Sequence, residues 1–70
     1  MKLHRIVYLI PDEQAITVAD AENSDILIDC ERVANALAGK TLVGLMSSEV
    51  VRLETGKDFG ELVIHIRVEE

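Results

Sequence analysis

Two histidines and one cysteine are the side chains in this 70-residue sequence that are best suited to proton transfer, nucleophilic attack or metal binding. His4 and His65 lie near opposite ends of the chain, each inside an apolar segment with strand-like composition. If those segments pair, the two imidazoles become neighbours, but no third metal ligand follows at a plausible spacing. A Cys30–His65 pair would also lack a third group to orient the base. We interpret both histidines as surface strand residues and Cys30 as a buried, unreactive thiol, and we expect no metal, no cofactor and no enzyme activity.

A glycine-lysine-threonine sequence at Gly39, Lys40 and Thr41 has the order found at the end of phosphate-binding loops. Such a loop needs a further glycine five residues before Gly39, and Ala34 occupies that position. The phosphate-binding motif is therefore not met.

Thr41 can instead begin a short helix, because its hydroxyl oxygen can accept a hydrogen bond from an amide two or three residues further on. Leu42, Leu45 and Met46 then share one face of that helix. Gly44 lies inside it and costs about 1 kcal/mol of helix stability relative to alanine. The apolar face is either a docking patch or part of the core.

The composition describes one small acidic domain, residues 1–70. Thirteen acidic and seven basic residues give a net charge of −6, so binding to nucleic acid or to an anionic membrane surface is disfavoured. No apolar run approaches the roughly 20 residues that span a bilayer. A single cysteine permits no internal disulfide, and we expect a cytoplasmic protein.

Apolar periodicity predicts strands over residues 3–10, 25–30 and 61–68. The last of these alternates most regularly, with Leu62, Ile64 and the following even-numbered residues on one face. Residues 54–58 read as a turn.

Three other segments are ambiguous. Residues 12–22 begin with acidic residues after Pro11, which favours a helix, although the alternation of residues 15–19 also fits one strand of a hairpin. The alanines of residues 31–39 favour a helix, and a short strand is the alternative. Residues 49–53 either extend the preceding helix or form an irregular strand.

Residues 40–47, K-T-L-V-G-L-M-S, resemble the K-S-I-M-G-V-M-S segment of the histidine-containing phosphocarrier proteins (HPr) of the bacterial sugar phosphotransferase system. Residues 33–36 are similar to the strand that precedes that segment in the family, if residues 37–39 are an insertion. Residues 60–66, G-E-L-V-I-H-I, are similar to the family's G-A-E-I-T-I strand.

The resemblance implies an α+β fold, an HPr-like open-faced sandwich with helices on one face of an antiparallel sheet in the order β-α-β-β-α-β. It favours a helix over residues 12–22 and, against alanine propensity, a strand over part of residues 31–39. The long C-terminal helix of the family has no counterpart in this sequence, which would leave apolar sheet surface uncovered. We therefore expect a homodimer or a protein partner on that surface.

The catalytic loop of the family, G-I-H-A-R-P, is missing, and Pro11 and Asp12 occupy its place. No imidazole therefore lies at the predicted helix start, where amides would stabilise a phosphoryl group. Thr41 occupies the place of the family's regulatory serine, which makes it a candidate phosphosite. The resemblance also implies a docking surface made of Leu42, Gly44, Leu45 and Met46.

We therefore expect a non-catalytic HPr-like interaction or regulatory domain that cannot carry phosphate on histidine. The first alternative is a phosphocarrier or phosphoacceptor that is modified on Thr41 or on an atypical histidine. The second is a purely structural oligomerisation module.

Overall fold

Seven short elements make up the part of the chain that the computed structural model describes, residues 1–56 and 60–68. In chain order they are α1 (Leu3–Val7), β1 (Ala15–Asp20), β2 (Ile26–Arg32), α2 (Val33–Ala38), α3 (Lys40–Leu45), β3 (Glu49–Thr55) and β4 (Leu62–Arg67). Together they form a small α+β fold, as the sequence predicts. Their order differs from the predicted β-α-β-β-α-β order.

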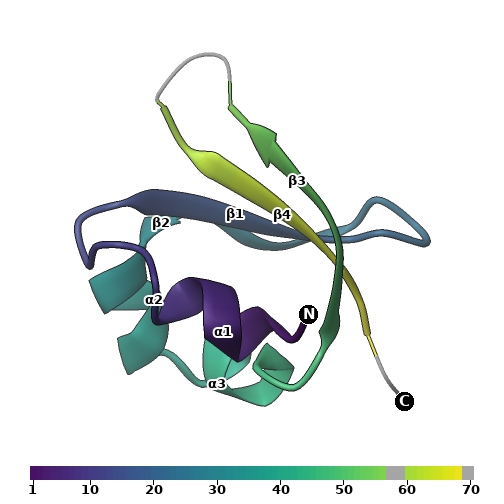
Figure 1. Ribbon diagram of the computed structural model, residues 1–70, viewed down its shortest axis with the longest axis horizontal. Helices are drawn as coiled ribbons and strands as arrows, with labels where there is room; N and C mark the ends of the chain where they lie inside the picture. The colour runs from purple at the N-terminus through teal and green to yellow at the C-terminus, as the bar shows by residue number, and fades with distance from the viewer. Residues whose placement is uncertain (57–59, 69–70) are drawn as a thin grey trace.

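The strands form one four-stranded sheet in the order β2-β1-β4-β3 (Figure 1). β1 pairs with β2, and β3 with β4, in antiparallel fashion. The two pairs join at the centre, where β1 and β4 run parallel and Val18 lies opposite Ile64. The sheet is therefore mixed, and the prediction of a wholly antiparallel sheet is wrong. Parallel neighbours need a long connection, which here contains β2, both later helices and β3.

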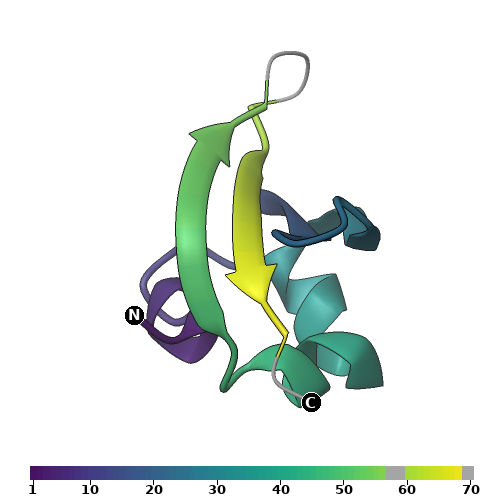
Figure 2. The same cartoon turned by 90° about the vertical axis from the view of Figure 1, so that its right-hand side faces the viewer.

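All three helices lie on one side of the sheet (Figure 1). In Figure 2, α1 lies near the start of β3, and α2 and α3 lie at the other flank of the helix layer. The core between the helices and the sheet is aliphatic and contains Leu3, Ile6, Val7, Ile16, Val18, Ile28, Val33, Ala36, Leu42, Ile64 and Ile66. The opposite side of the sheet carries none of the described helices, and we call it the helix-free face.

The segment predicted as a strand over residues 3–10 is wrong, because the chain forms helix α1 there. Leu3, Ile6 and Val7 have the spacing of a helical stripe, and all three are buried against the core. The helix start is anchored from a distance, since the Leu3 N–H donates to the carbonyl of Ser48 at 2.9 Å. The strand-like apolar composition of residues 3–10 is thus outweighed by tertiary contacts.

The helix predicted over residues 12–22 is also wrong, because β1 occupies this stretch. Ile16 and Val18 join the core, while Thr17 faces the other way and is buried as well. The strand reading of residues 15–19 was the correct alternative, but the hairpin partner is β2 rather than the preceding segment. A central strand is covered on both faces, which obscures its alternation.

Within residues 31–39, the strand that the resemblance implied at residues 33–36 is wrong, since β2 ends at Arg32 and α2 forms over Val33–Ala38 with Gly39 as its C-cap. Alanine propensity, which favoured a helix, gave the better prediction than the resemblance. The predicted strands over residues 25–30 and 61–68 are confirmed as β2 and β4, and residues 49–53 form a strand rather than a helix. The predicted turn of residues 54–58 starts inside β3, and its residues 57 and 58 lie outside the described residues.

Candidate functional site

The helix-free face brings together polar side chains from both central and edge strands. The register places Ala19, His65 and Arg52 side by side across β1, β4 and β3. Residues directly opposite each other in neighbouring strands point to the same face of a sheet. Because Ile64 and Ile66 point into the core, His65 between them points away from the helices.

A bulge in β3 decides which of its side chains reach this face. The register passes from Val50 opposite Ile66 to Arg52 opposite His65, so β3 holds one extra residue, Val51. A one-residue shift moves every later side chain to the other side of the sheet. The bulge therefore turns Arg52 toward the helix-free face.

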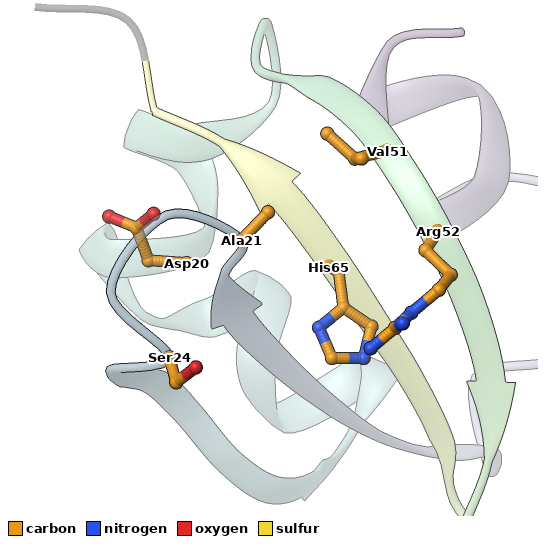
Figure 3. Close-up of a pocket in the computed structure, with 6 residues that line it drawn as sticks. All are labelled: Asp20, Ala21, Ser24, Val51, Arg52 and His65. Carbon is orange, nitrogen blue, oxygen red and sulfur yellow. The ribbon is translucent and has the colours of Figure 1, made fainter.

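A hollow of about 200 Å³ opens on this face between β3 and the β1–β2 turn (Figure 3). It is lined by Asp20, Ala21, Ser24, Val51, Arg52 and His65. Figure 3 shows Arg52 extending across β4 toward the His65 ring, while Asp20 and Ser24 lie on the far side of the hollow. Acidic and basic groups thus line the same hollow, so it favours neither a simple anion nor a simple cation.

The Glu54 carboxylate lies close to both Arg52 and His65 beside the hollow. One of its carboxylate oxygens lies 3.1 Å from Nη2 of Arg52, and the other lies 3.4 Å from Nε2 of His65. The His65 side chain is 19% exposed, and the side chains of Arg52 and Glu54 are 63% and 46% exposed. Solvent screens pairs as exposed as the Arg52–Glu54 pair, which contribute about 0–1 kcal/mol to stability. The Arg52–Glu54 pair therefore adds little to stability, and its importance is that it places two opposite charges on the edge strand.

A second polar cluster surrounds Thr17 near one end of β1. Its hydroxyl donates a hydrogen bond to the Glu61 carboxylate and accepts one from the N–H of Cys30, at 3.1 Å. Cys30 lies in β2 with a left-handed backbone (φ 45°), which non-glycine residues adopt rarely. Through the Thr17 hydroxyl, these hydrogen bonds connect this irregular part of β2 to β1 and to Glu61.

The Cys30 thiol is exposed, so the prediction of a buried thiol is wrong. Partial loss of water, a hydrogen bond to Glu61 and the negative charges of Glu61 and Asp29 all raise the pKa of Cys30. Because the residue is exposed, the loss of water is small and the carboxylates matter most. A raised pKa keeps the thiol protonated and weakly nucleophilic.

The two histidines are not cross-strand neighbours. His4 lies on α1, exposed, with Nδ1 at 3.2 Å from the carbonyl oxygen of Met46, whereas His65 lies within β4. Among residues 1–56 and 60–68, no three histidine, cysteine or acidic side chains lie together as a metal site. Within the same ranges, no helix has the length and apolar character needed to cross a membrane.

Thr41 lies in the first turn of α3 with its side chain exposed. It does not cap the helix as predicted, because the N-cap is Gly39 and no side chain supplies a capping hydrogen bond. Thr41 lines a second hollow of about 240 Å³, which also contains the acidic residues Asp29 and Glu31. These carboxylates would repel a phosphoryl group on the Thr41 oxygen.

The predicted docking residues divide between core and surface. Leu42 is fully buried, so its assignment to a docking surface is wrong. Leu45 and Met46 are half-buried and pack against the core, while Gly44 is exposed with open space around it. Val43, which the sequence analysis did not single out, is the large apolar residue that α3 exposes. The role of Gly44, Leu45 and Met46 as partner contacts stays a prediction.

Comparison with protein-family models, with curated proteins and with solved structures finds no match to this chain. The likeness of residues 40–47 to phosphocarrier proteins therefore depends on the sequence of that segment alone.

Proposed function

We propose that this protein is a non-catalytic protein-interaction domain that binds its partner through the sheet. The observation that carries the proposal is the exposure of β3, the edge strand. Its residues 51–55 are all exposed, and two of them, Val51 and Leu53, are apolar with half of their surface open to solvent (50% and 47%). An edge strand presents unpaired backbone donors and acceptors together with side chains, which is a common way of binding another chain.

The surface that supports this proposal differs from the one implied by the sequence. The resemblance implied binding through the α3 segment and an apolar sheet face, whereas the helix-free face is mixed, with Arg52, Glu54 and His65 among its residues. An HPr-like domain in a bacterial cytoplasm stays a prediction based on the resemblance of residues 33–36, 40–47 and 60–66.

A photo-crosslinking amino acid tests the proposal in cells that naturally contain the protein. Introduced at position 51 in place of Val51, it should give a defined crosslinked species, with the protein itself or with another protein. The same probe in place of Glu22, an exposed residue of the β1–β2 turn, is the matched control. Crosslinks from position 43 but not from position 51 would move the interaction surface to α3. No defined crosslink from either position would contradict the proposal.

A phosphoacceptor role for Thr41 is the second candidate, because its side chain is exposed. Intact mass after incubation with ATP and the kinase that acts on HPr tests it, and Thr41→Val is the control. We expect no added phosphate, since Asp29 and Glu31 share the hollow with Thr41. A mass increase that Thr41→Val abolishes would establish the phosphosite. Incubation with a phosphohistidine donor of the phosphotransferase system should likewise leave the mass unchanged.

A further inference from the structure

We propose that the partner of β3 is a second copy of this chain, and that two β3 strands pair antiparallel with Leu53 opposite its own copy. This inference depends on the proposed function and names the occupant of the exposed edge. The pairing would join the four-stranded sheets of the two copies, edge to edge, into one continuous sheet. Both helix layers would lie on the same side of it. A two-fold axis perpendicular to the sheet relates the two copies.

The available part of the edge has defined limits. At the start of β3, the Val50 N–H donates to the carbonyl of Met1 at 2.8 Å, and Lys2 forms a bridge with Glu49. Residues 51–55 continue beyond this contact, and no strand of residues 1–56 or 60–68 pairs with their outer edge. Five residues are therefore open to a second strand.

Symmetry restricts the possible registers. Facing residues of an antiparallel pair point to the same side of the sheet, so a symmetric pair must place one residue opposite its own copy. Within the open segment, an axis at Leu53 overlaps all five residues. An axis at Arg52 or at Glu54 overlaps only three, so the Leu53 register forms the most backbone hydrogen bonds.

The charges select the same register. With the axis at Leu53, Arg52 of each copy lies opposite Glu54 of the other, so two oppositely charged pairs form on the helix-free face. With the axis at Arg52 or at Glu54, a residue faces its own like charge, which is unfavourable. In one chain these two side chains already lie 3.1 Å apart, so both sit on the face where the new pairs would form.

The other edge of the sheet suits pairing less well. β2 carries two register irregularities against β1, and Cys30 interrupts its regular backbone with a positive φ. Bulges twist an edge strand away from an incoming partner. β3 has one bulge, at Val51 where the open segment begins, and its residues 52–55 pair with β4 without any shift, so most of the open segment presents a regular edge.

Charge reversal tests the register. Sedimentation velocity of the full chain, from about 1 μM to about 1 mM, should show a monomer–dimer equilibrium, as expected for a small interface. Arg52→Glu and Glu54→Arg each place like charges opposite one another, so each should raise the dimer dissociation constant about tenfold or more. In an equimolar mixture of the two variants the charges are again complementary, and a heterodimer should form. Arg32→Glu, an exposed change of equal charge on β2, should leave the wild-type equilibrium unchanged.

Disulfide trapping provides a second test that does not depend on charge. In a Cys30→Ser background, Leu53→Cys should form a disulfide-linked dimer on oxidation, because this position meets itself at the axis. Val43→Cys, at a position on α3 that is more exposed than Leu53, should not.

A wild-type protein that stays monomeric throughout the concentration range would overturn the inference. So would dimers that both charge variants retain, or an equimolar mixture that remains monomeric. If position 51 crosslinks to a different protein while the purified chain is monomeric, the interaction function holds and only the choice of a second copy fails. If neither crosslinks nor dimers are found, both proposals fail.

Discussion

Arg52 and Glu54 form an ion pair along β3, with Nη2 of Arg52 at 3.1 Å from Oε1 of Glu54. Residues two apart in a strand share a face, so both charges lie on the helix-free side of the sheet. The edge strand therefore presents a positive charge at Arg52, just before Leu53, and a negative charge at Glu54, just after it. A strand with this pattern is complementary to a reversed copy of itself.

Leu42 and Val43 should respond differently to truncation, although they are adjacent on α3. Leu42→Ala removes a fully buried side chain and should lower the free energy of unfolding by about 2–5 kcal/mol. Val43→Ala should change it by no more than about 0.5 kcal/mol, because Val43 is 60% exposed. Urea unfolding followed by circular dichroism measures both. Equal small effects would contradict the assignment of Leu42 to the core.

Glycine-to-alanine substitutions should have opposite signs at two positions. Gly44 lies in α3 with open space where a Cβ would be, so Gly44→Ala should stabilise the protein by about 0.5–1 kcal/mol. A Cβ at Gly56 would overlap Cγ of Glu61, so Gly56→Ala should destabilise it by about 1–3 kcal/mol. Thermal unfolding of the two variants side by side gives the comparison. Stabilisation by both would mean that Glu61 can move aside without loss.

Thr17→Val should be destabilising by about 1–3 kcal/mol, although the two side chains have nearly the same shape. The change leaves the Glu61 carboxylate and the Cys30 N–H without their common partner. Thr41→Val, at an exposed position with no capping bond, is the matched control and should be nearly neutral. Chemical denaturation of both variants checks this. A neutral Thr17→Val would show that water replaces the hydroxyl.

Alkylation of Cys30 should be slow for an exposed thiol. The thiolate is the reactive form, and the neighbouring carboxylates raise the pKa of Cys30, so the reaction rate should rise only at a higher pH than for an ordinary cysteine. Glu61→Gln removes one negative charge, lowers this pKa and should shift the rate profile toward lower pH. The iodoacetamide rate as a function of pH measures the shift. An unchanged profile would mean that Glu61 does not act on the thiol.

Several features could be predicted from the sequence because they depend on local alternation. In β4 the odd and even residues differ clearly in polarity, since one face meets the core and the other meets solvent. The face of His65 followed from this alternation alone. The charges of Arg52 and Glu54 are equally visible in the sequence, but their face depends on the bulge at Val51, which only pairing with β4 creates.

The tertiary structure decided the remaining elements. The apolar residues of α1 are compatible with a strand or a helix. The helix forms because it places Leu3, Ile6 and Val7 together against the core. The helix start after Pro11 and the family resemblance outweighed the alternation of residues 15–19, which pairing with β2 and β4 shows to be the correct signal for β1. Local sequence determined the amphipathic elements of this protein, whereas long-range contacts decided those that are buried all round or have no polar face to orient them.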